Sequence, residues 1–359
     1  MKKKNAISLI VLVITIIVMA ILAATVIITL SNTNIISEAN DAVKKTEAQQ
    51  VEELKALMLA DGMLGKNPEP QTIGSTTLTW NDTEKKVEAK VEGVLIPEGF
   101  SYVEGTKDTG LVIEDKEGNQ FVWVPVEYTA TGVTDANGLD TGFTVVFKRG
   151  TAQETATGSG IYKMTGVLDE KYSEPPADGF MANVEEYYAM MKSVQKYNGF
   201  YIARFEAGEE NNKIVSKKGT NVYNSVDSSI RSSMYKGSAS VVSTLCYGVQ
   251  WDATLNFVSD TEHNITDSRS WGNYQTSIGA AATNSGTLQT CGTNEAWKAK
   301  NIYDLAGNVE EWTMEYSGSG CFALRGGAYY YGSAADYRDG AGMGMSMEFY
   351  GFRVTLYLK

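Results

Sequence analysis

The sequence predicts a mixed α+β protein in which a long N-terminal helix precedes an irregular, loop-rich domain. Residues 7–30 carry no charge, and no glycine or proline interrupts residues 7–61. The remainder is rich in glycine (35 residues in the whole chain) and tyrosine (20), and it alternates short strand-like stretches with long loops. We expect a basic leader at 1–6, a helix at 7–61, a linker with a small hairpin at 62–95 and a head domain at 96–359.

Composition narrows the class of protein. The chain has 31 basic and 43 acidic residues and a formal net charge of -12, which argues against a nucleic-acid binder and suits a secreted or cell-surface domain. Its single histidine, His263, excludes a His-rich metal site and a conventional His-based triad. Cys246, Cys291 and Cys321 have no CxxC spacing, so one disulfide with a free thiol and three reduced thiols both remain open.

The uncharged run at 7–30 exceeds the ~20 residues that a helix needs to cross a bilayer. Lys2, Lys3 and Lys4 precede it, which predicts a cytoplasmic N-terminus and an extracellular head. A cleaved secretory signal is the competing interpretation, but its apolar core usually has only ~7–15 residues. The sequence therefore predicts a protein anchored in the membrane with its head at the cell surface.

The same helix is predicted to continue beyond the membrane. Ala48, Val51, Leu54 and Met58 recur at helical spacing, and the first helix-breaking residue is Gly62. At ~1.5 Å per residue, a continuous helix over 7–61 would be about 80 Å long. The polar stretch at 31–34 can bend it at the membrane edge.

The stretch KKKNAISLIVLVITIIVMAILAATVI resembles the N-terminus of a type IV pilin or pseudopilin. The resemblance implies that a prepilin peptidase cuts between Ala6 and Ile7, as in prepilin cleavage and methylation motifs, and that other pilin subunits are partners. Two residues depart from the pattern: Ala6 replaces the usual glycine, and Val11 replaces the glutamate expected at the fifth mature position. Because that glutamate helps to register subunits, assembly into a filament and a plain uncleaved anchor both remain open.

After the linker, short elements are predicted in order along the chain. Strands are expected at 76–80 and 86–91 as a hairpin, then at 110–113 and 120–126. Helices are expected at 185–196 and from Tyr247 to Leu255, the second burying Trp251, with a strand at 200–206 between them. Long loops join these elements, and loops of this kind commonly carry specificity.

Five blocks in the head carry a second resemblance. FYIARFEAG, YGVQWDATLNF, NIYDLAGNVEEW, ALRGGAYY and GFRV occur in this order between Phe200 and Val354. They resemble the formylglycine-generating enzyme (sulfatase-modifying factor) family. That resemblance implies a variant of the C-type lectin fold for the head.

The resemblance does not extend to the family's catalytic residues. The family's oxidases use a pair of cysteines after the RGG block, and the aligned positions here fall at about Tyr331 and Asp336. No cysteine follows Cys321, so a thiolate is absent where the chemistry needs one. We expect the protein not to be an enzyme. An enzyme of the formylglycine-generating type, or a related oxidase, is the alternative.

The block DLAGNVEEW is a candidate metal site. Two carboxylates with backbone carbonyl oxygens suit a hard, flexible cation such as calcium. The resemblance implies a structural calcium held by Asp304 and Glu311 and by the carbonyl oxygens of Gly307 and Val309. The alternative is a turn in which Asp304 and Glu311 bond backbone amides while Trp312 anchors the core.

The run between ALRGG and GFRV is the candidate binding face. Tyrosine offers a large amphipathic contact area at small rotamer cost, and methionine a soft surface that accommodates varied partners. Some of these side chains could instead fill the core, as Arg338 and Phe352 are expected to do. The predicted ligand-binding residues are Tyr329, Tyr330, Tyr331, Ser333, Asp336, Tyr337, Met343, Met345, Ser346, Met347, Glu348 and Tyr350.

The arrangement LRGG…GFRV also resembles the variable proteins of diversity-generating retroelements, in which the diversified positions lie between these blocks. The resemblance implies a head whose binding face is diversified. The predicted function is therefore a bacterial surface or pilus-associated protein that displays a head for an unknown protein or glycan ligand. Besides an enzyme, a purely structural pilin remains an alternative.

Overall fold

The computed structural model describes residues 35–126, 144–149, 152–158, 162–163, 184–233, 239–318, 320–331 and 334–359. The predicted leader, the processing residues Ala6 and Ile7 and the apolar run at 7–30 lie outside them. Within the described ranges, no helix has both the length and the apolar character needed to cross a membrane. The described chain is mixed α+β, as predicted, and strands outnumber helices.

The chain divides into two compact units. The first contains α2 (Ile35–Met63), β1 (Gln71–Ile73) and most of β2 (Thr76–Asn81), and the second contains residues 88–359. The division falls at residue 87. A four-stranded sheet has the order β1-β2-β3-β4, where the last two are β3 (Lys86–Val91) and β4 (Val94–Ile96).

The predicted apolar stripe of the helix is confirmed in α2. Ala48, Val51 and Leu54 are half-buried and Met58 is buried, while most neighbouring positions are exposed. Near the end of the helix, a Cβ atom added to Gly62 would lie 2.5 Å from the Trp80 ring. Glycine therefore allows the close approach of α2 to the hairpin that follows.

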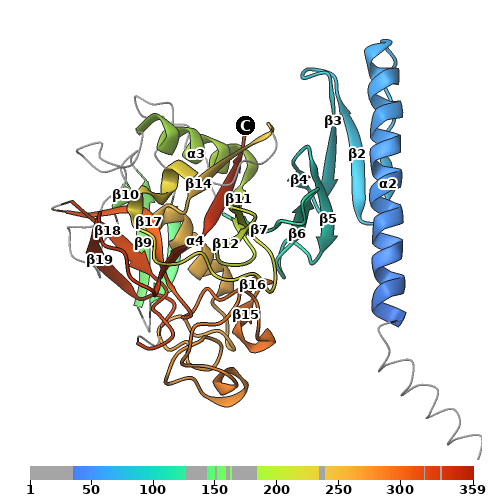
Figure 1. The fold of residues 1–359 in the computed structure, drawn as a ribbon. Helices are drawn as coiled ribbons and strands as arrows, with labels where there is room; N and C mark the ends of the chain where they lie inside the picture. Colours follow the sequence, from blue (N-terminus) through green and yellow to red (C-terminus); the bar gives the residue numbers. More distant parts are fainter. Residues whose placement is uncertain are drawn as a thin grey trace, which may run out of the picture. The chain divides into compact units, whose positions relative to one another are not determined.

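The core of the head is built on a six-stranded sheet in the order β14-β21-β11-β7-β6-β5, in which every neighbouring pair is antiparallel (Figure 1). The two strands β11 (Gly199–Ala203) and β21 (Val354–Leu358) are buried along their whole length. The others are β5 (Phe100–Glu104), β6 (Val112–Asp115), β7 (Gln120–Pro125) and β14 (Val241–Leu245).

Two helices pack against this sheet. Helix α3 (Val184–Tyr197) contacts β11 and β21, and helix α4 (Gly248–Val258) contacts β7. Both helices were predicted within a few residues of their observed ends. Trp251 and Leu255 of α4 are buried, as expected from their spacing.

A second sheet of the head has the order β19-β18-β17-β20 (Figure 1). Here β17 (Glu310–Gly318), β18 (Cys321–Arg325) and β19 (Arg338–Gly342) are antiparallel neighbours. The short strand β20 (Tyr350–Phe352) runs parallel to the start of β17. The chain between β18 and β20 is the run predicted to bind a ligand.

Smaller elements complete the described chain. One further sheet has the order β10-β9-β8, and two pairs are β12-β13 and β15-β16. Their bounds are β8 (Thr144–Arg149), β9 (Ala152–Gly158), β10 (Tyr162–Lys163), β12 (Gly208–Glu210), β13 (Lys213–Val215), β15 (Lys298–Ala299) and β16 (Ile302–Tyr303). Three 3-10 helices are η1 (Ser228–Ser233), η2 (Gly279–Ala282) and η3 (Glu295–Trp297).

Candidate ligand-binding face

Two segments of the predicted binding run meet at the start of β17. The parallel pairing of β17 with β20 places Glu310 opposite Tyr350 and Trp312 opposite Phe352. The turn after β18 also lies at the start of β17, because Tyr329 donates its backbone N–H to the carbonyl oxygen of Asn308 at 3.0 Å. We call the surface formed by Tyr329, Tyr330, Tyr331, Asp339, Met345, Ser346, Met347 and Glu348 the terminal face.

The rings beneath and on the terminal face form one continuous cluster. The ring centroids of Tyr330 lie 5.3 Å from Tyr329, 4.6 Å from Tyr331 and 4.8 Å from Phe349. Phe349 in turn lies 4.8 Å from Tyr350, which packs 5.4 Å from Trp312 in the core. All these pairs are edge-to-face, an arrangement that contributes about 0.5–1.5 kcal/mol each beyond area burial. The exposed rings are therefore held in fixed positions by the core.

The structure divides the predicted binding residues by exposure. Tyr330, Met345 and Met347 are each 40% exposed, and Ser346 and Glu348 are also exposed. The half-buried members are Tyr329, Tyr331, Asp336, Tyr337 and Met343. Tyr350 is only 7% exposed and belongs to the supporting core, because Trp312 and Phe349 enclose its ring. Ser333 lies outside the described residues.

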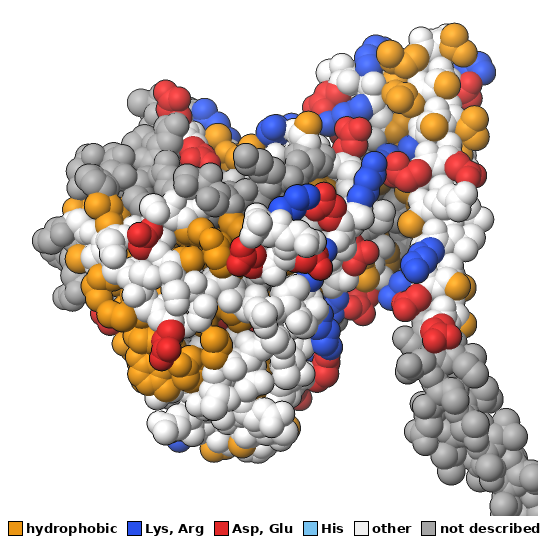
Figure 2. All heavy atoms as spheres, in the orientation of Figure 1, with side chains coloured by type: hydrophobic (Ala, Val, Ile, Leu, Met, Phe, Trp, Pro, Cys, Tyr) orange, Lys and Arg blue, Asp and Glu red, His pale blue; other side chains and the backbone are white. Residues whose placement is uncertain are grey.

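Hydrogen bonds to the loop around η1 fix the methionine-containing segment. The Ser346 hydroxyl donates to the carbonyl oxygen of Ser225 at 2.5 Å, and the Ser228 hydroxyl donates to that of Met343 at 2.9 Å. The Asn224 side chain donates to the Glu348 carbonyl oxygen. The exposed methionines therefore stand on an anchored loop. Figure 2 shows hydrophobic side chains gathered with acidic ones on the head, away from its Lys and Arg side chains.

Two buried arginines support the strands below the terminal face. Arg325 pairs with Asp252 at 2.7 Å and Glu315 at 3.2 Å, and Arg338 pairs with the same two carboxylates at 3.0 and 3.2 Å. The four side chains are at most 6% exposed and have no net charge together. They join α4, β17, β18 and β19. The expectation that Arg338 belongs to the scaffold is confirmed.

The arginine of the GFRV block makes a separate buried ion pair. Both Nε and Nη2 of Arg353 donate to the Glu311 carboxylate, at 2.8–3.1 Å. Its remaining donors reach the carbonyl oxygens of Ala203 at 3.0 Å and Tyr303 at 2.9 Å. One side chain thus ties β17 to β11 and β16, as expected for a scaffold position.

The DLAGN turn depends on backbone conformations with positive φ. Asp304, Gly307 and Asn308 have φ of 54°, 78° and 61°. A Cβ atom at Gly307 would lie 2.1 Å from the carbonyl oxygen of Asn273, so only glycine fits there. The Asn308 amide donates to the Glu206 carboxylate at 2.5 Å and accepts from the Asn273 amide at 2.9 Å. This turn sets the start of β17.

Three of the four carboxylate oxygens predicted to bind calcium already accept hydrogen bonds in the structure. Calcium takes six to eight oxygen ligands. Both oxygens of Glu311 are occupied by Arg353, and Oδ2 of Asp304 accepts the Gly292 N–H at 2.7 Å. Asp304 Oδ1 is buried without a hydrogen-bond partner, and burial raises the pKa of this carboxyl to about 7. Within the described ranges, no cluster of three or more His, Cys, Asp or Glu side chains could hold a metal.

Glu310 lies beneath the terminal face and was not among the residues predicted from the sequence. It is 1% exposed, and neither carboxylate oxygen has a hydrogen-bond partner of ordinary geometry. Burial raises its pKa to about 7; the nearby Tyr331 hydroxyl lowers it in part, and Asp339 raises it further. The sequence feature that could have revealed Glu310 is the pair of adjacent glutamates in NVEEW. Because side chains alternate along a strand, the two glutamates must lie on opposite faces of it. Asp339 and Phe349 were also missed as members of the site.

None of the three cysteines is a member of the terminal face, although Cys321 pairs with Gly342 in the neighbouring strand. Cys246 and Cys291 are buried, Cys321 is half-buried, and none of the three forms a disulfide. Burial raises the pKa of the Cys291 thiol well above its ordinary value. Tyr331 stands beside Glu310, and Asp336 donates its backbone N–H to the Ile265 carbonyl oxygen at 3.1 Å.

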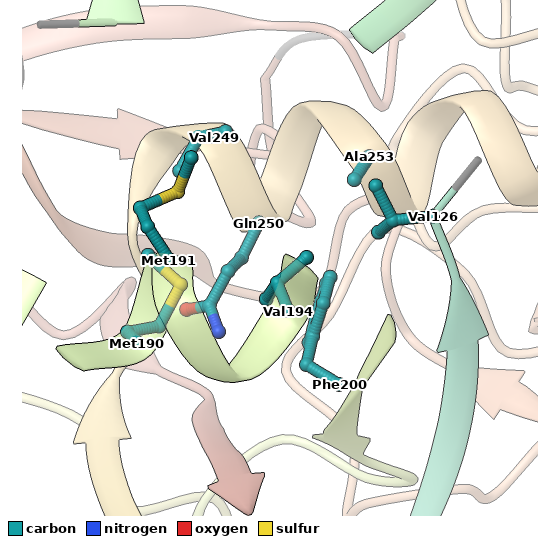
Figure 3. A pocket seen from close by; sticks show the side chains of 8 residues that line it. All are labelled: Val126, Met190, Met191, Val194, Phe200, Val249, Gln250 and Ala253. Atoms are coloured by element: carbon teal, nitrogen blue, oxygen red, sulfur yellow. The ribbon is translucent and has the colours of Figure 1, made fainter. Parts of the chain in front are cut away.

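A different region of the head contains an apolar pocket between its two helices. Figure 3 shows Met190, Met191 and Val194 of α3 facing Val249 and Ala253 of α4. Gln250 is its polar lining residue, and its Oε1 already accepts from the Tyr247 N–H and the Thr355 hydroxyl. Ligand pockets usually offer several convergent polar groups, so the terminal face is the better candidate site.

Comparison with known proteins adds little to this geometry. No family model matches the chain, and no curated protein matches it. Among solved structures, the chain is similar to Treponema denticola variable protein 1, with a TM-score of 0.26 and 12% sequence identity. The alignment covers 81% of this chain and 99% of that one. The likeness is distant, and neither the fold class nor the binding site rests on it.

Proposed function

We propose that this protein is a non-enzymatic, displayed binding protein whose terminal face takes a protein ligand. The observation that carries the proposal is the ring cluster, which leads from buried Trp312 to Tyr330, 40% exposed. Rigid aromatic anchors beside adaptable polar and methionine side chains are typical of paratopes. Exposing such rings costs burial energy, and a ligand that covers them recovers it.

A selection experiment tests this function. The full-length chain, kept in mild detergent because residues 7–30 are uncharged, is presented to a random 12-residue peptide library and, separately, to a glycan array. We expect enriched peptides whose binding is lost in Tyr330→Ala and kept in Leu57→Ala. Leu57 is a matched control because it is an exposed apolar residue on α2, 66% exposed. Binding to glycans alone, or peptides indifferent to Tyr330→Ala, would contradict the proposal.

The absence of catalysis is part of the proposal. It is supported by the tyrosine and aspartate that stand at the two aligned cysteine positions, since oxidation of a substrate cysteine by this family needs thiolates there. Incubation of the full-length protein with a sulfatase-motif peptide should leave the peptide cysteine unchanged by mass spectrometry. Formylglycine in the product would establish the enzyme instead.

We place the head, of C-type lectin-like fold, outside the cell on a pilin-like helix. The uncharged run at 7–30 after three lysines supports an anchored chain, and the stripe along α2 supports a helix that continues beyond it. Diversification of the terminal face is the remaining part of the proposal. A reverse transcriptase gene beside a near-repeat of the final coding segment would support it, and a neighbourhood without either would count against it.

A further inference from the structure

We propose that the terminal face binds a cationic side chain, a lysine or arginine on a partner protein, over its tyrosine rings, with the Glu310 carboxylate as counter-charge. This inference rests on the proposed function, because it names the chemistry that the same face would recognise. It draws on a buried carboxylate, the rings around it and the distribution of basic residues.

The first observation is a buried carboxylate beside a tyrosine of the terminal face. Glu310 is 1% exposed, and the Tyr331 hydroxyl is the hydrogen-bond donor that faces its carboxylate. A buried carboxylate that no cation pairs with is rare, because burying a charge without a counter-charge costs free energy. Glu310 cannot turn away, since its backbone N–H is bonded to the Phe349 carbonyl oxygen at 2.8 Å and its strand pairs with β20.

The side chain of Glu310 is directed toward the terminal face. Strand alternation puts it on the side opposite Glu311, whose carboxylate is bound by Arg353 in the core. The groups whose charge interacts with Glu310 are Tyr274, Tyr330, Tyr331, Tyr350 and Asp339. Tyr274 and Tyr350 are buried, and the other three belong to the terminal face as defined above.

The second observation is that this part of the chain provides no cation of its own. Between Lys300 and Lys359 there is no lysine, and the arginines are Arg325, Arg338 and Arg353. All three have side chains at most 2% exposed and paired with buried carboxylates. The acidic residues Asp339 and Glu348 are exposed on the same face.

The third observation is that the chain already holds lysines in this manner elsewhere. The Tyr303 hydroxyl donates to Glu295 at 2.7 Å, and the Nζ atoms of Lys218 and Lys298 lie 5.5 and 5.4 Å from the Tyr303 ring centroid. Both lysines also pair with Glu295. On the terminal face, the Tyr329 hydroxyl donates to Glu348 at 3.4 Å, which is a tyrosine–glutamate pair of the same kind.

A cation on the ligand would gain from both groups. Tyrosine faces attract a cation by about 0.5–1 kcal/mol when exposed and up to about 2 kcal/mol when desolvated. The buried Glu310 carboxylate beneath the rings strengthens that attraction through space, because charges interact more strongly in a low-dielectric interior than in water. An uncharged side chain of the same shape would gain neither contribution.

The experiment uses the peptides selected on the full-length protein that require Tyr330. We expect them to contain arginine or lysine and to bind about tenfold more weakly when arginine is replaced by citrulline, its uncharged isostere. Tyr330-dependent peptides without basic residues, or equal binding of the citrulline forms, would overturn the cationic ligand and leave the proposed binding function standing. A library with no Tyr330-dependent binder would remove both.

A variant of the protein tests whether Glu310 is the counter-charge for the ligand's cation. Glu310→Gln should bind arginine and citrulline peptides alike, whereas Glu53→Gln on α2 should keep the tenfold difference. If Glu310→Gln retains the difference, the assignment to Glu310 is wrong. Should this variant not fold, as judged by its melting transition, the arginine-to-citrulline comparison on the unaltered protein still decides whether the face requires a cation.

Discussion

Gly307 is the residue on which the turn below the terminal face depends most directly. Its φ of 78° and the 2.1 Å approach of an added Cβ to the Asn273 carbonyl oxygen leave no room for a side chain. Gly320 has nearly the same φ, 75°, but a Cβ there would meet nothing within 4 Å. Substituting alanine at Gly320 would therefore cause backbone strain alone, whereas alanine at Gly307 would cause the same strain and also a steric clash.

We predict that Gly307→Ala lowers the free energy of unfolding by about 3 kcal/mol and Gly320→Ala by about 1 kcal/mol. Both variants place alanine in the left-handed region, and only the first also drives it into a backbone oxygen. Urea unfolding with unchanged m-values measures the difference. Equal losses in the two variants would mean that the DLAGN turn can shift to accept a side chain.

A second prediction at this scale concerns Arg353. Replacing it with methionine leaves Glu311 charged and buried and also frees the carbonyl oxygens of Ala203 and Tyr303. We expect a loss of about 3–5 kcal/mol in the free energy of unfolding. Lys213→Ala, which removes an exposed pair with Glu117, should cost less than about 1 kcal/mol. Similar losses in urea denaturation would show that the buried pair gives no special support.

The same ion pair bears on calcium. Because Arg353 occupies both oxygens of Glu311, we expect the melting temperature of the full-length protein to be the same in excess EDTA and in millimolar calcium. A melting temperature that falls by several degrees in EDTA and recovers with calcium, but not with magnesium, would instead support the predicted calcium site.

At the scale of elements, the contacts between the short helix η3 and strand β15 should make the stability of the fold depend on pH. Burial disfavours the charged form of Glu295, but hydrogen bonds from Lys218, Tyr303 and Lys298 outweigh it and lower its pKa to about 2. A lowered pKa means that Glu295 stabilises the fold above its ordinary pKa of about 4.5. That contribution is lost as the pH falls from about 4.5 toward 2.

We therefore predict that Glu295→Gln lowers the melting temperature at pH 6 and that the difference from the unaltered protein shrinks below pH 4.5. The Glu295 side chain is 59% exposed, so solvent screening limits the effect to about 1 kcal/mol or less. Melting curves of both proteins between pH 3 and 7 check it. A difference that does not vary with pH would assign the effect to packing rather than to charge.

Elements were easier to predict than their arrangement. The periodicity and composition of α3, α4, β7 and β11 are local properties, so their positions could be read within a few residues. The order of the strands could not, because it depends on distant contacts. Arg325 reaches Asp252 across 73 residues, and Arg353 reaches Ala203 across 150. A single sequence does not reveal such pairs.

The candidate site was predicted in part for the same reason. Its tyrosines and methionines could be chosen by residue type, since large amphipathic side chains without aliphatic neighbours suit a surface. The burial of Tyr350 could not be predicted, because it follows from the parallel pairing of β20 with β17. Glu310 was missed because its burial becomes visible only when its neighbours are placed.

At the scale of the whole molecule, the anchor remains the main prediction. If a prepilin peptidase processes the chain, N-terminal sequencing of the mature protein should begin at Ile7, and Ala6→Glu should block the cut by placing a charged, larger side chain at the cleavage site. A chain that keeps Met1 would be an ordinary anchored protein. Loss of the whole uncharged run would instead indicate a secretory signal.

The position of β21 has a consequence for how the head can fold during synthesis. This strand, at residues 354–358, lies between β14 and β11 inside the six-stranded sheet. A ribosome that has made the first three hundred residues has therefore produced a sheet with a gap between β14 and β11. Non-local pairing of this kind is slow, and the waiting chain exposes unpaired strand edges to aggregation. Substitutions in the run just before β21 are tolerable only if they still let the last strand close that gap.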